Sequence, residues 1–382
     1  MIEEFNTLVR DLYKTSDVIS LHEPSFIGKE KEYLSEVISS TFVSSVGKSI
    51  GEFEKKIASY MGVDHAVATS NGTSALHLSL LVSGVSQNTE VITQSLTFVA
   101  TCNAIDYCGA SPVFVDIDKE TLSMSPLSLL EFLDKYAEVR DDGSCWNKTS
   151  GKEITACLPM HSYGFPAAIE EINLICSRFN IPLVEDCAES LGSFYHKKHT
   201  GSESLLCALS FNGNKIITTG GGGMVLTNNL DLSNKVRHLS TVAKVEHPWE
   251  FNHDKVGFNY RMPNLNAALG LAQIESLDKF LVSKKSLASC YYDWGKERGM
   301  VFHRGQQDTS PNYWLNCLIT ENLESRDKFI RETNKNNIRT RPSWNPAHSL
   351  PPYQDCQRDR LENTSWVFER LVNVPSSPIL DL

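Results

Sequence analysis

The sequence lacks the patterns that mark zinc sites, membrane spans and the two common nucleotide-binding loops. Its ten cysteines form no C-x-x-C pair, and none is followed by an H-x(3–5)-H spacing, so no metal site is expected. No apolar run approaches the roughly 18 residues that a membrane-spanning helix needs. Neither G-x-G-x-x-G nor G-x-x-x-x-G-K-[ST] occurs. Internal repeats and low-complexity tracts are missing as well, which excludes solenoids and disordered tails.

An excess of positive charge is also missing. Lys and Arg number 36 against 46 Asp and Glu, which gives a formal charge of −10. A mildly acidic chain is a poor general binder of nucleic acid, although a local pocket of amides or cations can still hold an anion. The N-terminal segment MIEEFNTLVRDLYK is acidic and amphipathic, unlike a secretory signal. We therefore expect a cytoplasmic protein with buried, reduced thiols and with no membrane or nucleic-acid partner.

What is present, from about residue 65 onward, is an alternation of short apolar strands with helices. Helices are expected at 73–82, 98–108, 125–136 and 167–179, and the polar stretch 134–153 reads as a surface insertion. The expected strands are nearly all apolar: HAVAT, EVITQ, PVFVDI, ITACLPM, IPLVED, LLCALSF and GMVLTN. Such strands between helices indicate an α/β fold whose mostly parallel sheet is buried on both faces.

After about residue 245 the pattern changes. A long helix is expected over 265–296, short strands at 300–303 and 312–319, and a further helix at 327–337. The length of 382 residues suits two or three domains. We predict a large α/β domain, residues 1–250 with the N-terminal helices, and a small C-terminal α+β domain, residues 251–382.

Four segments carry side chains suited to chemistry. Lys215 follows Ser210, at a predicted strand end, and precedes four glycines in SFNGNKIITTGGGGMV. Asp186 ends the strand in IPLVEDCAES, at the edge where open α/β sheets bind ligands. Taken alone, Lys215 could be a solvated surface lysine, and Asp186 could be a helix cap.

The other two segments open helices. In TSNGTSALHL, Thr73 and Ser74 offer hydroxyls and free amides that suit a phosphate. Phe98 begins the helix of SLTFVAT. A simple capping turn and a core aromatic are the ordinary alternatives. Together, however, an amine, a strand-end carboxylate, a phosphate cradle and an aromatic ring are what pyridoxal 5′-phosphate requires of a protein.

Nearly the whole chain resembles the fold type I, pyridoxal-phosphate-dependent nucleotide-sugar aminotransferases, which have an aspartate aminotransferase-like fold. The resemblance rests on segments spread from residue 45 to residue 353: SVGK, NGTSALHL, SLTFVATCNAI, PVFVDID, PMHSYGFP, LVEDCAESLGS, SFNGNKIITTGGGGM, GFNYRMPNLNAALGLAQIE and TRPSWNPAHSLPPY. SFNGNK with TTGGGG and the polar insertion most resembles the subgroup that acts on UDP-linked 2-acetamido-4-keto-6-deoxyhexoses for legionaminic-acid-type surface glycans. The family resemblance implies a large three-layer domain and a smaller C-terminal domain.

The resemblance also implies a role for each matching residue. Lys215 would be the Schiff-base lysine and proton carrier, and Asp186 would bind the pyridine nitrogen. Glu189 falls near the ring hydroxyl, where many relatives have Gln or His, so its role is open. Thr73, Ser74 and Ser210 would hold the phosphate, and Phe98 would stack on the ring. Asn259 of GFNYR would reach the phosphate of a partner's cofactor, which implies a homodimer with shared active sites. The substrate-contact candidates are His161, Arg341 and His348, each of which could equally be a structural or surface residue.

The implied reaction has two halves. L-glutamate would convert the cofactor to pyridoxamine 5′-phosphate, and the keto sugar would then accept the amine at C4, with ping-pong kinetics. The alternatives are a GDP- or dTDP-linked substrate and a non-catalytic protein that binds the cofactor or a sugar for regulation. A sugar 3-dehydratase of the same fold is disfavoured because those relatives have His in place of Lys215. A cysteine hydrolase is disfavoured because no cysteine has a nucleophile context.

Overall fold

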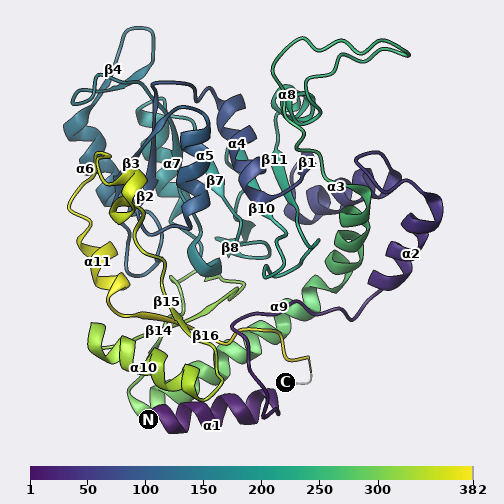
Figure 1. The fold of residues 1–382 in the computed structure, drawn as a ribbon. Coiled ribbons are helices and arrows are strands. Elements are labelled where there is room, and N and C mark those ends of the chain that lie inside the picture. Colours follow the sequence, from purple (N-terminus) through teal and green to yellow (C-terminus); the bar gives the residue numbers. More distant parts are fainter. Residues whose placement is uncertain (381–382) are drawn as a thin grey trace.

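Within residues 1–380, which the computed structural model describes, a seven-stranded sheet forms the centre of the larger part (Figure 1). Its strands lie in the order β1, β11, β10, β7, β6, β2, β3. Their bounds are His65–Thr69, Gly223–Thr227, Leu206–Ser210, Val184–Asp186, Ile154–Leu158, Glu90–Gln94 and Ser111–Val115. Neighbours pair in parallel except for the two pairs that β11 makes. The predicted, mostly parallel sheet is confirmed.

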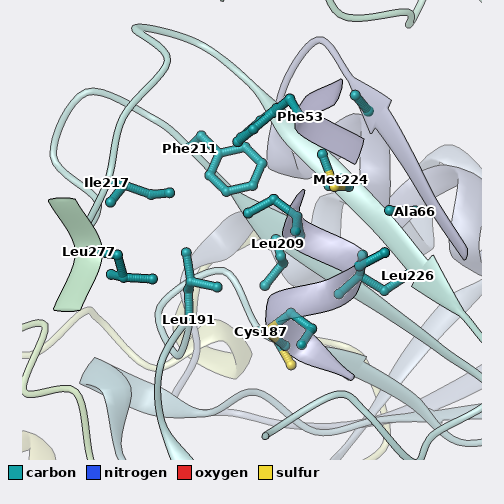
Figure 2. Close-up of a cluster of buried hydrophobic side chains, with 14 of the residues drawn as sticks. Phe53, Ala66, Cys187, Leu191, Leu209, Phe211, Ile217, Met224, Leu226 and Leu277 are labelled. Atoms are coloured by element: carbon teal, nitrogen blue, oxygen red, sulfur yellow. The ribbon is translucent and has the colours of Figure 1, made fainter. Parts of the chain in front are cut away.

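Helices cover both faces of this sheet. One face is covered by α4 (Gly72–Ser83), α5 (Val99–Tyr107) and α8 (Leu230–Ser240), and the other by α3 (Lys48–Met61), α6 (Pro126–Tyr136), α7 (Ile169–Arg178) and the first half of α9 (Asn264–Arg298). Strand alternation sorts the side chains between the two faces. In β11, Val225 packs toward α4 and α8, whereas Met224 and Leu226 pack toward α3 and α9 (Figure 2). The three-layer α/β/α arrangement is therefore confirmed.

A smaller antiparallel sheet lies in the C-terminal part. Its order is β12 (Val301–Phe302), β14 (Asn316–Ile319), β16 (Leu371–Val374) and β15 (Arg341–Pro342), with α10 (Leu323–Lys335) and α11 (Glu362–Phe368) beside it. Helix α9 runs through both parts. Leu277 packs in the core below the central sheet, and Leu287 and Tyr291 pack in the core of the C-terminal part. This one helix therefore sets the position of the C-terminal part against the sheet.

The two N-terminal helices divide between the parts. Helix α2 (Glu30–Ser40) packs on α9, but α1 (Ile2–Tyr13) joins the C-terminal core, where Phe5 contacts Tyr291 and Phe329 (Figure 1). We expected α1 to belong with the first domain. Its amphipathic face instead covers an apolar surface formed by α9 and α10, which lie some 300 residues later in the chain. The division at residue 250 remains a prediction.

Three further features complete the chain. The insertion expected at 134–153 begins only after α6 ends at Tyr136, and it contains a hairpin of β4 (Ala137–Val139) and β5 (Cys145–Asn147). Strands β8 (Phe194–Tyr195), β9 (Lys198–His199) and β13 (Thr309–Ser310) link the two parts. Residues 241–260 project from the body as a long loop beyond α8 (Figure 1). Among the helices of residues 1–380, none combines the length and apolar character that a bilayer crossing needs.

Candidate functional site

A cavity of about 300 Å³ opens where the carboxyl ends of β7 and β10 meet the N-terminus of α4 and the C-terminal part. The topology explains this position, since parallel strands end at one edge of the sheet and leave a crevice there. The cavity brings together residues that lie far apart in the sequence. Seven of the predicted site residues line it: Thr73, Phe98, Asp186, Glu189, Ser210, Lys215 and Arg341.

Asp186, the last residue of β7, provides a buried carboxylate on the cavity wall. Its side chain is 2% exposed, and its carboxylate oxygens accept hydrogen bonds from the Thr101 hydroxyl (2.8 Å) and the Ala188 amide (3.1 Å). Burial raises the pKa of Asp186, and these two hydrogen bonds act in the opposite direction. Within residues 1–380 no Lys, Arg or His lies within salt-bridge distance of it. A buried anion without a cationic partner is costly, so this position suits a ligand that presents a cationic N–H.

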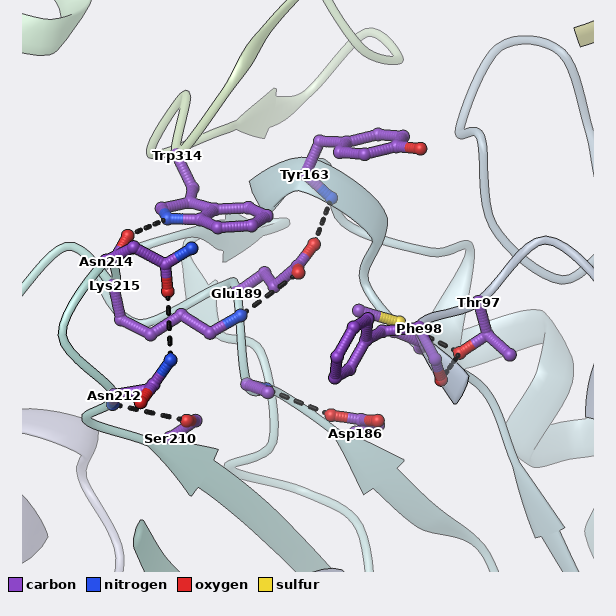
Figure 3. Close-up of polar contacts among 12 residues, drawn as sticks. Thr97, Phe98, Tyr163, Asp186, Glu189, Ser210, Asn212, Asn214, Lys215 and Trp314 are labelled. Atoms are coloured by element: carbon purple, nitrogen blue, oxygen red, sulfur yellow. Dashed lines mark hydrogen bonds and ion pairs between the residues drawn. The ribbon is translucent and has the colours of Figure 1, made fainter. Parts of the chain in front are cut away.

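Lys215 and Glu189 form an ion pair at the centre of the cavity. The Lys215 amine lies 3.1 Å from Oε1 of Glu189, and the lysine side chain as a whole is 11% exposed (Figure 3). The second carboxylate oxygen of Glu189 accepts the Tyr163 backbone N–H at 2.8 Å. Burial raises the pKa of Glu189, and Lys215 and Arg341 counteract that shift. The amine is therefore held beside a fixed carboxylate while it faces the cavity.

The turn from β1 into α4 forms the end of the cavity that suits an anion. The first amides of any helix lack an acceptor within that helix, so those at Gly72 and Thr73 are available in principle to an anionic ligand. The Ser210 hydroxyl closes the same end. Gly72 permits this approach, because a Cβ there would lie 2.8 Å from the Cβ of Ser210. Gly223 is packed in the same way, since its Cβ would lie 2.4 Å from the Asn71 carbonyl oxygen.

Aromatic rings form the remaining walls. Phe98, the residue before α5, is 49% exposed, and its ring lies 6.3 Å from that of Trp344. Trp344 in turn stacks on Tyr163 at 4.4 Å and 14°. Trp314 covers the Lys215 side chain from the C-terminal part (Figure 3). Flat walls of this kind leave room for a planar ring between Phe98 and Asp186.

Four predicted residues do not line the cavity. The amide of Ser74 is taken by the side chain of Asn71, which caps α4 at 2.8 Å. His348 lies outside with Nδ1 2.6 Å from the Ser95 hydroxyl. Asn259 lies on the exposed loop 241–260, paired with Thr241.

His161 is the fourth, and it lies behind the strand end, fully buried. Its Nδ1 accepts the Ala167 amide at 2.9 Å, so Nε2 must carry the proton that it shares with Glu185 at 2.7 Å. Because both ring nitrogens are occupied, His161 supports the strand that ends at Asp186. Cys187 lies close to this pair, but the hydrogen bonds account for both partners without a metal.

Several cavity residues were not anticipated from the sequence. Trp314 and Trp344, both in the C-terminal part, were not expected to line a site, although Trp344 lies within the TRPSWNPAHSLPPY segment. Thr101 supports Asp186 from α5, three residues after Phe98. Helical spacing could have indicated that Thr101 shares a face with Phe98, but nothing local indicated the two indoles.

The site suits pyridoxal 5′-phosphate on the observations above. Asp186 offers a buried carboxylate, α4 and Ser210 offer an anion cradle, Lys215 offers an amine, and Phe98 offers a ring face. The anion cradle and the Asp186 carboxylate line the same continuous cavity, so one ligand could reach both.

Comparisons with known proteins agree with this geometry. The model of the DegT/DnrJ/EryC1/StrS aminotransferase family matches residues 24–382. A GDP-perosamine synthase of Escherichia coli O157:H7 is 38% identical over 364 residues, covering 95% of this chain and 94% of the relative. One from Vibrio cholerae is 35% identical over 367 residues, covering 94% of each. The crystal structure of the aminotransferase TlmJ from Streptoalloteichus hindustanus superimposes with a TM-score of 0.85 at 25% identity, over 96% of this chain and 94% of that one.

The predicted fold type I architecture is confirmed by this structural likeness. The family model covers almost the whole sequence, and the Escherichia coli relative matches 95% of it. The chain belongs to the DegT/DnrJ/EryC1/StrS aminotransferase family and is a pyridoxal-phosphate-dependent sugar aminotransferase.

Proposed function

We propose that this enzyme moves an amino group from L-glutamate to C4 of a 4-keto-6-deoxy nucleotide sugar. The observation that carries the proposal is the placement of the Lys215 amine, the Asp186 carboxylate and the α4 anion cradle around one cavity. This is the arrangement an aminotransferase requires, and the intact Lys215 argues against the dehydratase and purely regulatory alternatives. The amino sugar formed would remain linked to its nucleotide.

The nucleotide is proposed to be guanosine diphosphate. The sequence motifs led us to expect a UDP-linked 2-acetamido sugar and a legionaminic-acid-type pathway. The relatives do not support that subgroup, since three of them, at 35–38% identity, are named GDP-perosamine synthases. Short motifs around the cofactor report the reaction type, whereas the nucleotide is selected by surfaces farther from it. The GDP alternative that the sequence left open is therefore the better supported one.

The roles of the residues follow from their positions. When bound, pyridoxal phosphate supplies an aldehyde that carries the amino group and a ring that withdraws electrons from the reacting carbon. Asp186 would hold the ring nitrogen protonated, because a buried carboxylate favours a neighbouring positive charge. The free amine of Lys215 would take the proton from Cα of glutamate and later deliver one to C4 of the sugar. Glu189 would hold that amine in place between the two transfers.

We propose further that the enzyme works as a homodimer in which Asn259 contacts the partner's cofactor phosphate. Two facts support this. Asn259 does not reach the cavity of its own chain, and the loop that carries it exposes apolar side chains: Trp249 (76%), Phe251 (76%) and Val256 (87%). A mixture of Lys215→Ala and Asn259→Ala chains would test the shared site. Hybrid dimers with one intact site should recover activity that neither variant has alone, and no recovery would contradict the exchange.

The substrate proposal is tested with a panel of GDP-, dTDP- and UDP-linked 4-keto-6-deoxy sugars, each incubated with L-glutamate. The mass of each product shows whether a keto oxygen has been replaced by an amino group. We expect amination of the GDP-linked sugar and formation of 2-oxoglutarate in equal amount. Amination of a UDP-linked sugar alone would overturn the choice of nucleotide and leave the reaction intact. No amination of any member would overturn the proposed function.

A further inference from the structure

Trp314 contacts the Lys215 segment in two separate ways. Its indole N–H donates to the carbonyl oxygen of Asn214, the residue before Lys215, at 2.7 Å. The centroid of its ring lies 4.1 Å from the Lys215 amine, and the indole lies over the lysine side chain (Figure 3). The first contact fixes the main chain from which the lysine extends, and the second fixes the end of its side chain. A residue that only filled space would require neither.

Trp314 is itself held rigidly. It is 2% exposed, its backbone N–H donates to Oδ1 of Asn312 at 2.7 Å, and its carbonyl accepts from the buried Lys284 amine at 3.2 Å. The indole therefore cannot follow Lys215 if that side chain moves. Because Trp314 is held rigidly, it can fix the position of the more mobile Lys215 side chain.

Asn312 ties this unit to the turn that carries Glu189. Its side-chain amide donates to the backbone carbonyls of Glu189 (2.8 Å) and Leu191 (2.9 Å). Gly164 makes room for it, because a Cβ at Gly164 would lie 1.9 Å from Oδ1 of Asn312. The two groups that face the Lys215 amine, the Glu189 carboxylate and the Trp314 ring, are thus held at a fixed separation by one asparagine.

We propose that Trp314 is a positioning residue for Lys215: it holds the free amine beside Glu189 and aims it at the cavity. The proposal rests on the proposed role of Lys215. It gives the lysine a defined location whenever its amine is not bonded to the cofactor. A free lysine side chain would otherwise sample many rotamers. Attack on a carbonyl carbon would then be slow, because only a few of those rotamers place the amine correctly.

The test measures how fast the full-length chain, freed of cofactor, captures added pyridoxal phosphate. In the capture step the Lys215 nitrogen attacks the aldehyde carbon, a C=N bond forms, and the aldehyde oxygen leaves as water. Stopped-flow absorbance separates binding, whose rate rises with cofactor concentration, from bond formation, whose rate does not. Borohydride reduction and peptide mass then identify the lysine that reacted.

Two variants and one control separate positioning from packing. Trp314→Phe keeps a ring but loses the N–H, and we expect bond formation to slow about tenfold, the effect of one lost buried hydrogen bond. Trp314→Leu also loses the ring face and should be slower still. The concentration-dependent phase should match that of the wild type in both. Trp294→Phe, in the distant core beside Phe5, should change neither phase.

The outcomes are distinct. An unchanged rate of bond formation in Trp314→Phe, with the wild-type protein reacting at Lys215, would overturn the positioning role alone. Equal slowing of both phases together with a lower melting temperature would also overturn it, because that result describes packing. If Trp314→Leu does not fold, Trp314→Phe decides the question. If the wild-type chain forms no bond at Lys215, the proposed function fails and this proposal fails with it.

Discussion

The two walls of the cavity differ in how they are built and in what they carry. The sheet wall consists of strand ends and a helix N-terminus, and it carries both buried carboxylates and the lysine. The C-terminal wall consists of Trp314 and of Arg341 and Trp344, which lie three residues apart in one segment, and its one cation has no carboxylate within 4 Å in the described part of the chain. We propose a division of work in which proton transfer and ring binding belong to the sheet wall and substrate recognition and orientation belong to the other.

The largest effect should come from removing charge on the sheet wall. Asp186→Asn keeps the size of the side chain and its bond with Thr101, but loses the anion that would hold the ring nitrogen protonated. We expect the turnover rate to fall by at least about a hundredfold, as when one preorganised electrostatic contact is removed. Turnover with glutamate and keto sugar measures it. The control is Asp231→Asn, on the exposed first turn of α8. Normal turnover in Asp186→Asn would contradict the role assigned to the sheet wall.

A change on the C-terminal wall should act on binding instead. Arg341→Met removes a cation that lines the cavity and whose Nε has no hydrogen-bond acceptor. We expect the KM of an anionic substrate to rise about tenfold or more, since a charge-assisted hydrogen bond contributes roughly 1.5–3 kcal/mol. The effect on kcat should be small. Arg339→Met, exposed two residues away, is the matched control. A fall in kcat with constant KM values would show that Arg341 acts in the chemical step, and would contradict the assignment of substrate binding alone to the C-terminal wall.

Close packing at the anion cradle gives a test on the sheet wall that involves no charge. In Gly72→Ala the new methyl would press on the Cβ of Ser210 and force the turn open. Strain of about 1–3 kcal/mol would weaken cofactor binding roughly tenfold. Cofactor titration measures it. The control is Gly51→Ala in α3, where a Cβ meets no atom within 4 Å, so this change should stabilise the fold slightly. Equal cofactor affinity in both variants would contradict the close approach.

The smallest effect concerns how the two walls are joined. His303 of the C-terminal part meets Phe165 edge-on at 4.5 Å, and burial lowers its pKa to about 4. The unfolded chain binds a proton at about pH 6.5, so the stability that neutral His303 contributes is complete above that pH and is lost as the pH falls toward 4. The free energy of unfolding should decrease by on the order of 1 kcal/mol more between pH 7 and pH 5 than in His303→Phe. Urea unfolding at both pH values measures it, and identical pH dependences would exclude His303 as the cause.

The sheet wall could be predicted from the sequence because each of its groups is local. Asp186 and Ser210 follow apolar strands directly, and Thr73 follows a strand and opens a helix, so burial pattern and chain direction place all of them at one edge. Local reasoning did not indicate that the Ser74 amide donates to the Asn71 side chain. For His161 it left a structural role open, and the structure shows both ring nitrogens hydrogen-bonded, to Glu185 and to Ala167.

On the C-terminal wall only Arg341 was expected from the sequence, because the contacts of the two tryptophans span the chain. Trp314 meets Asn214 across 100 residues, and Tyr163 meets Trp344 across 181 residues. No periodicity or motif encodes such pairs; they depend on how α9 places one sheet against the other. The same reason explains why short motifs indicated the reaction class, which the relatives support, but did not identify the nucleotide, which remains a proposal.

The central claim is that Lys215, held between the two walls, is the residue that bonds the cofactor. The most direct measurement is borohydride reduction of the purified enzyme with its pyridoxal phosphate, followed by peptide mass spectrometry. We expect the phosphopyridoxyl group on Lys215 and on no other lysine, and prior addition of L-glutamate should prevent the labelling. A label on a different lysine, or none, would contradict the account.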